Sequence, residues 1–180
     1  IDLFYTYFSN KIIPDYGNQN FIIYKNSTGY AYSKGISGAL NHTFLNQTAF
    51  SLTFNHQIVR YAQIENNIES IFDMEHSPKW SAAFNLKIPI NKKWSMNSSS
   101  NYVGIMELPK VFVMNDNGKI NSVSRPTKSK PFSIHNINVN GIFNSGNEIY
   151  FGLLNIFNFR QKESPLVAYN DPNYSKGFRP

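Results

Sequence analysis

The chain has 180 residues, no cysteine, and a formal net charge of +6 from 17 lysine and arginine residues against 11 acidic ones. This length allows one domain, and the lack of cysteine excludes disulfides and thiolate metal sites. Charged residues make up 16% of the chain, below the roughly 25% of soluble domains, and aromatic residues also make up 16%, which is high.

This composition fits two all-β classes. A soluble β-sandwich can have it, and a membrane β-barrel is expected to have it, because one face of each strand meets lipid and the other a polar lumen. No run of about 18 apolar residues occurs, so no transmembrane helix is predicted. The chain shows no signal peptide and begins inside a strand-like run at Ile1. We therefore expect an internal fragment or a truncated gene product.

The first two predicted strands cover residues 1–10 and 30–44. In the first, Leu3, Tyr5 and Tyr7 alternate with more polar residues, as the side chains of a half-buried strand do. A loop containing proline, glycine and asparagine follows, and residues 22–24 are expected to extend the ladder briefly. In the second strand, Gly35 and Gly38 predict a bend or a bulge.

The next three strands are predicted at residues 49–59, 79–90 and 94–106, with a long polar loop at 63–78. The strand at 49–59 alternates most clearly, with Phe50, Leu52 and Phe54 against Ser51 and Thr53. Strands at 132–143 and 148–159 form a hairpin around a turn at 144–147. Each arm of this hairpin has about the length, roughly 9–11 residues, that lets a tilted β-strand cross a bilayer.

Short and long connections alternate along the chain. Short turns are predicted near Leu45, Asn91 and Ser145, and long loops start near Lys11, Gln63, Glu107 and Arg160. Outer-membrane barrels have short periplasmic turns and long outer loops. A soluble sandwich has no reason to alternate so regularly, so this pattern favours a membrane barrel.

Aromatic residues flank both kinds of connection, as in the aromatic girdles of membrane barrels. Next to the short turns lie Phe44, Phe50, Trp94, Phe143 and Tyr150, and near the long loops lie Tyr30, Tyr61, Trp80, Tyr102, Phe132 and Phe157. A composition this rich in aromatic residues also scatters some of them by chance. The girdle is therefore a weaker indication than the alternation of the connections.

Six short motifs occur in order along most of the chain: LFYTYFSNKI (3–12), IYKN with GYAYSKG (23–26, 29–35), SPKWS (77–81), NYVG with LP (101–104, 108–109), RPT with PFSIHN (125–127, 131–136), and EIY with NIFN (148–150, 155–158). Each motif is weak alone. Together they resemble the barrel of TonB-dependent outer-membrane receptors of the Bacteroidetes type.

The resemblance implies an antiparallel up-and-down transmembrane β-barrel, of which this chain supplies about seven strands near the C-terminus. Residues 1–180 would form a partial barrel domain that lacks the plug and the final closing strand. Such receptors bind and import a scarce nutrient, typically a ferric siderophore, haem or cobalamin. The implied partners are outer-membrane lipid, the nutrient, and the TonB complex through the missing plug. The implied location is the outer membrane of a Gram-negative cell.

Two loop clusters are candidate ligand contacts. Asp73, Glu75 and His76 combine carboxylates with an imidazole in the loop predicted at 63–78, and Met74 lies between them. Such a set can bind a metal, but no second cluster supports it, so contact with a ligand is the stronger prediction. The loop starting at Glu107 is basic, with Lys110, Lys119, Arg125, Lys128 and Lys130. It would attract an anionic ligand if it is not simply a solvated loop.

No constellation for catalysis or for a cofactor is present. His42, His56 and His135 fall on predicted strands without an activated serine, and no glycine-rich phosphate loop occurs. The basic residues do not cluster beside stacking aromatics, so no nucleic-acid partner is expected. The alternative to a receptor is a soluble all-β module that binds a carbohydrate or another ligand, with Trp80 or Trp94 as a stacking platform.

Overall fold

The computed structural model describes residues 1–15, 23–108, 112–114, 120–122, 127–143 and 146–160. These residues form strands, turns and loops, and the all-β, antiparallel class predicted from the sequence is confirmed. No helix long and apolar enough to cross a membrane occurs among them. Residues 144–145 of the predicted turn, much of the loop predicted from Glu107, and residues 161–180 lie outside the described residues.

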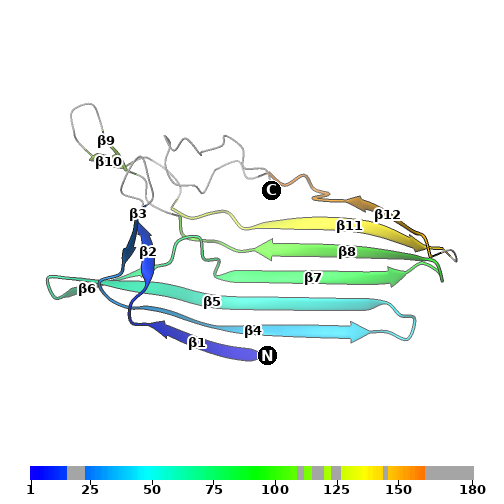
Figure 1. The fold of residues 1–180 in the computed structure, drawn as a ribbon, viewed down its shortest axis with the longest axis horizontal. Coiled ribbons are helices and arrows are strands. Elements are labelled where there is room, and N and C mark those ends of the chain that lie inside the picture. The colour runs from blue at the N-terminus through cyan, green and yellow to red at the C-terminus, as the bar shows by residue number, and fades with distance from the viewer. Residues whose placement is uncertain (16–22, 109–111, 115–119, 123–126, 144–145, 161–180) are drawn as a thin grey trace.

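Within this part of the chain, seven strands lie side by side in chain order in one antiparallel sheet (Figure 1). They are β1 (Asp2–Phe8), β4 (Ala31–Thr43), β5 (Ala49–Glu65), β7 (Trp80–Pro89), β8 (Trp94–Val103), β11 (Phe132–Ile142) and β12 (Glu148–Leu153). A further strand, β6 (Ile68–Asp73), pairs with the end of β5 that extends beyond β7. The arrangement is the up-and-down order that the sequence predicts.

The two ends of the sheet carry different connections (Figure 1). Short turns join β4 to β5, β7 to β8 and β11 to β12 at one end. At the other end lie β6 and two small hairpins, β2 (Ile12–Asp15) with β3 (Ile23–Asn26) and β9 (Phe112–Met114) with β10 (Ile120–Ser122). The end with the three short turns is called the short-turn end, and the end with β6 and the two small hairpins is called the loop end. This arrangement follows the predicted alternation of connections.

Asparagine side chains close two of the short turns. Asn46 Oδ1 accepts a hydrogen bond from the Thr48 amide at 3.0 Å. Asn91 Oδ1 accepts from the amides of Lys93 at 2.9 Å and Trp94 at 3.0 Å. Asparagine satisfies the backbone of a turn locally in this way, so the turns at Leu45 and Asn91 were predictable from residue type.

Three predicted boundaries are wrong. The loop predicted at 63–78 is a β-hairpin over its first half, because β5 continues to Glu65 and turns through Asn66 and Asn67, with φ of 50° and 63°. The described residues of the segment at 22–24 pair with β2 in a separate hairpin and do not extend the main ladder. The last strand ends at Leu153 and does not reach Phe159.

Residues 155–159 form a turn that is organised around one side chain. Asn155 Oδ1 accepts from the Phe159 amide at 2.8 Å, and Asn155 Nδ2 donates to the Phe159 carbonyl at 2.9 Å. The Asn155 amide donates to Asn136 Oδ1 at 2.8 Å, which ties the turn to β11. Asn155 and Asn158 both have positive φ, so they cannot continue a strand.

The register of the sheet separates the side chains into two faces, since directly opposite residues point the same way. Leu52 is opposite Leu40 and Phe84, whereas Thr53 is opposite Ala39 and Ala83. The apolar face carries Leu3, Tyr5, Tyr7, Tyr32, Ile36, Leu40, Phe50, Leu52, Phe54, Trp80, Phe84, Leu86, Trp94, Met96, Tyr102, Val139, Phe151 and Leu153. The polar face carries Ser33, Ser37, Asn41, Ser51, Thr53, Asn55, Ser81, Asn85, Ser95, Asn97, Ser99, Asn136, Asn138 and Asn140.

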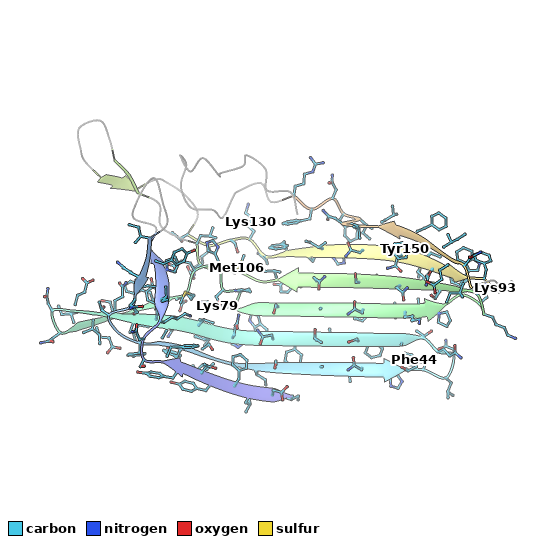
Figure 2. All side chains as sticks on the ribbon, viewed as in Figure 1. Phe44, Lys79, Lys93, Met106, Lys130 and Tyr150 are labelled. Atoms are coloured by element: carbon cyan, nitrogen blue, oxygen red, sulfur yellow. The ribbon has the colours of Figure 1, made fainter. Side chains whose placement is uncertain are left out.

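The apolar face is not covered by any part of the chain that the structure describes. Leu52 and Phe54, in the middle of the sheet, are each 37% exposed, and the only buried apolar residues described are Ile13, Ala31 and Ala62. Figure 2 shows side chains along a single sheet, with Phe44 and Lys93 at the short-turn end and Lys79 and Met106 towards the loop end. The sheet is therefore one layer without a hydrophobic core of its own.

No bulge occurs at Gly35 or Gly38, although a bulge is one of the two outcomes that the sequence predicted there. The pairing of β4 with β5 is unbroken from Ala31 opposite Tyr61 to Thr43 opposite Ala49. A Cβ at Gly38 would lie 2.5 Å from Cε1 of Phe54. The glycine is there because a ring lies across its backbone, an arrangement known to stabilise sheets.

Candidate functional site

The candidate site lies at the loop end, where the connection between β5 and β7 meets the one between β8 and β11. It consists of Glu75, His76, Glu107 and Lys128, and Asp73 lies next to it in the chain. The two connections are joined by bridges from Glu75 to Glu107 and from Glu107 to Lys128. The amide of His76 donates to the Glu107 carbonyl at 2.9 Å. Glu75, His76, Glu107 and Lys128 are called the loop-end cluster.

Asp73 is held by two cations. It stands opposite Arg60 in the β5–β6 hairpin, and Arg60 Nε donates to its Oδ1 at 2.7 Å. Lys79 Nζ donates to its Oδ2 at 2.9 Å. The hydrogen bond from Lys79, followed by the one from Arg60, lowers the pKa of the Asp73 carboxyl below its usual value. Because both oxygens are engaged, Asp73 fixes the hairpin and offers little to a ligand.

Glu75 and His76 are in a different environment, although they follow Asp73 closely. Both are half-buried. Burial, with a smaller contribution from the nearby Glu107 charge, raises the pKa of the Glu75 carboxyl. Burial lowers the pKa of the His76 imidazole. Each shift favours the neutral form of its group, so these two side chains suit a hydrogen-bonded contact better than a charged one.

Glu107 is the member of the cluster that the sequence did not indicate. It bridges Glu75 on one side and Lys128 on the other, and Lys128 Nζ lies 3.4 Å from its Oε1. In the sequence it is a single acidic residue at the start of a long loop, 32 positions after Glu75, with no motif around it. Only the fold brings these residues together.

The structure thus joins three of the six predicted contact residues, namely Glu75, His76 and Lys128. Asp73 belongs to the neighbouring ion-pair network. Lys110 and Arg125 lie outside the described residues, as does Lys119 of the same predicted basic loop. In the described part of the chain, no three histidine, aspartate, glutamate or cysteine side chains are grouped so that they could hold a metal ion.

The polar face contains a second feature of interest, a hollow of about 430 Å³. It lies over β4, β5, β7, β8 and β11. The residues that line it are Asn41, His42, Thr43, Ala49, Phe50, Ser51, Asn85, Leu86, Lys87, Asn97, Ser98, Ser99 and Asn138. Asn97 Nδ2 donates to Asn138 Oδ1 at 2.9 Å across two strands of this surface. The hollowed side of the sheet is therefore the side rich in amides and hydroxyls.

The three strand histidines lie on the apolar face, beside aromatic rings. His42 contacts Phe44 with ring centroids 4.5 Å apart, and His56 contacts Trp80 at 4.2 Å. His135 lies between two hydroxyls, with Nδ1 2.7 Å from Ser100 Oγ and Nε2 2.8 Å from Ser133 Oγ. No carboxylate completes a catalytic arrangement around His135 among the contacts of the described residues.

Comparison with known proteins adds no identification. The chain matches no protein-family model, no curated protein and no solved structure. Function must therefore be argued from the sheet and its two ends.

Proposed function

We propose that the chain is part of a transmembrane β-barrel of the outer membrane, and that the barrel is a TonB-dependent receptor that binds and imports a scarce nutrient such as a ferric siderophore, haem or a cobalamin-like molecule. The supporting observation is the distribution of polarity on the sheet. The apolar face is exposed, and the polar face is the hollowed one. A water-soluble barrel or sandwich buries its apolar residues inside, whereas a membrane barrel has a lipid-facing apolar exterior and a polar interior.

The strand edges support closure with further strands. β1 and β12 end the described sheet, and each has only one partner in it. A lipid bilayer cannot hydrogen-bond the free edge of a sheet, so a sheet that spans one must close into a barrel. We therefore propose that further strands flank β1 and β12 and complete the barrel.

The assignment to nutrient import depends on the motif resemblance and on the loop end. Recognition in such a receptor would fall to the outer loops, where Glu75, His76, Glu107 and Lys128 are held together. The resemblance does not distinguish a ferric siderophore, haem and a cobalamin-like molecule as the imported nutrient. TonB would act through a plug in the same receptor.

The position of the tryptophans argues against a soluble carbohydrate-binding module. Trp80 and Trp94 both stand on the apolar face, and most of the amides and hydroxyls that could bind a sugar, including those that line the hollow, stand on the other face. A stacking platform works only when hydrogen-bonding groups surround it. Tryptophan at the two ends of an apolar face is instead typical of a membrane interface.

The lipid-facing surface can be tested by fluorescence. The intact protein is isolated from its membrane fraction and reconstituted into vesicles of phosphatidylcholine with or without brominated acyl chains. We expect brominated lipid to quench Trp80, and a Trp80→Phe variant to lose the corresponding part of the quenching. A protein that is recovered in the soluble fraction, or whose Trp80 is not quenched, contradicts the barrel.

Import requires a separate test in cells. A strain that lacks the gene is compared with its parent for uptake of a labelled ferric siderophore, haem and cobalamin, with and without TonB. We expect uptake of one of the three to fall in the deletion strain and in the strain without TonB. Unchanged uptake of all three contradicts the receptor function while leaving the barrel intact.

A further inference from the structure

The apolar face contains few charged side chains. In the described residues of the seven strands that run side by side, this face carries two cations, Lys34 and Arg60, and no carboxylate. Arg60 is paired with Asp73 of β6 at 2.7 Å. Lys34 is exposed and has no carboxylate partner among the described residues. Lys34 is therefore a cation on an apolar surface with no ion-pair partner among these residues. Glu69 of β6, which stands on the same face, accepts a hydrogen bond from the Tyr30 hydroxyl.

Tyrosines lie beside Lys34 on the side of β1, and Ile58 of β5 stands on its other side. Tyr5 stands directly opposite Lys34 on β1, and Lys34 Nζ lies 5.8 Å from the centre of the Tyr32 ring. The rings of Tyr5 and Tyr32 stack with centroids 6.3 Å apart, and those of Tyr7 and Tyr30 at 5.6 Å. Tyr5 and Tyr7 are 65% and 53% exposed. These four tyrosines and Lys34 are called the tyrosine–lysine patch.

The patch lies towards the loop end of the sheet, since Lys34 is close to the start of β4. If the apolar face meets lipid, this is the level at which acyl chains give way to headgroups. Lysine is costly at the centre of a bilayer and is tolerated near the interface. Tyrosine prefers the same level, because its ring is apolar and its hydroxyl is polar.

We propose that the tyrosine–lysine patch binds the negatively charged, phosphate-bearing headgroup of a membrane lipid. Lys34 Nζ donates to the phosphate, and the acyl chains lie along the apolar face below. The hydroxyls of Tyr5 and Tyr7 offer further donors, whereas the Tyr30 hydroxyl already donates to Glu69 Oε1 at 2.6 Å. An anionic lipid is the expected occupant because Lys34 has no ion-pair partner among the described residues, and the surface around it otherwise suits acyl chains. A nutrient in the lumen cannot take this place, since the patch is on the opposite face from the polar hollow. This inference rests on the proposed membrane barrel.

The test counts bound lipids on the intact protein, purified in a neutral detergent, by native mass spectrometry. The probes are phosphatidylglycerol, phosphatidylcholine and inorganic phosphate. The test variant is Lys34→Gln, and Lys87→Gln is the matched control, because Lys87 stands on the polar face. Both variants are first required to retain the heat-modifiable migration of the folded protein.

We expect the parent protein and Lys87→Gln to bind phosphatidylglycerol about fivefold more tightly than Lys34→Gln does, which corresponds to the loss of one lysine contact with an anionic lipid. Phosphatidylcholine should bind all three proteins equally. Equal phosphatidylglycerol affinity in all three proteins overturns the lipid site and leaves the barrel standing. Inorganic phosphate bound as tightly as the lipid also overturns it, in favour of a simple anion site. Failure of every protein to bind either lipid overturns the barrel together with the site.

Discussion

The two faces of the sheet are built from the same strands, yet they differ in almost every side chain. On β5, Leu52 and Phe54 point to one side, and Ser51, Thr53 and Asn55 point to the other. The first side is exposed without cover, and the second is hollowed and connected by hydrogen bonds such as Asn97 to Asn138. A single ladder with a two-residue repeat can therefore present two unrelated surfaces.

This difference shows which solvent each face is suited to. A soluble sheet has its polar face in water and its apolar face against a core. Here the apolar side has no such core in the described residues, and the polar side carries the hollow. Each of the three predictions below substitutes two residues that lie close together in the chain and compares the effects of the two substitutions.

The largest effect is expected from a charge in the middle of the sheet. Leu52→Arg places a guanidinium on the apolar face, and Thr53→Arg places the same group on the polar face. In vesicles, we expect Leu52→Arg to lower the free energy of unfolding by about 2–4 kcal/mol, and Thr53→Arg to change it by about 0.5 kcal/mol or less. Denaturant titration of the intact protein measures both. Equal losses of unfolding free energy in the two variants would contradict the expectation that the two faces meet different solvents.

A smaller effect is expected where a glycine lies under a ring. Gly38→Val forces a side chain against Phe54, whose Cε1 is 2.5 Å from the position of the new Cβ. We expect a loss of about 1–3 kcal/mol in the free energy of unfolding. Ala39→Val, on the opposite face and exposed, should be close to neutral. In a Phe54→Ala background the cost of Gly38→Val should shrink, and a double-mutant cycle that shows no coupling contradicts the account.

The smallest effects are expected at the loop end, where two acidic residues should respond to pH in opposite directions. The pKa of Asp73 is lowered by Lys79 and Arg60, so its contribution to stability is present at neutral pH and is lost as the pH falls through the folded-state pKa. The pKa of Glu75 is raised by burial, so its contribution is greatest at low pH and is lost as the pH rises through its folded-state pKa.

Hydrogen exchange of residues 60–79 in the intact protein, followed against pH, separates the two carboxyls. Asp73→Asn should weaken protection at neutral pH by about 0.2–1 kcal/mol per ion pair, because Arg60 and Lys79 are partly exposed. Glu75→Gln should strengthen protection at neutral pH, and protection in this variant should no longer fall as the pH rises. If both variants change protection in the same direction, the two carboxyls do not have the different environments described above.

The strands, their alternation and the three short turns were predictable from the sequence, because each depends on neighbouring residues. The clear two-residue repeat at 49–59 fixes which side chains share a face, and asparagines mark the turns at Leu45 and Asn91. The extension of β5 to Glu65 was missed because the charged Arg60 interrupts the apolar positions, although Gln63, Ile64 and Glu65 resume the alternation. Tyr61, Phe132 and Tyr150 were assigned to a girdle, but they fall on the polar face by register.

The sequence alone determined the all-β fold class, since polarity at alternate positions is a local property of each strand. The tertiary structure decided everything that depends on register and on contacts between distant segments. It placed Glu107 between Glu75 and Lys128, laid Phe54 over Gly38, and set Lys34 beside Tyr5 of β1 and Tyr32 of β4. It also placed a hollow of about 430 Å³ on the polar face, where residues of five strands meet.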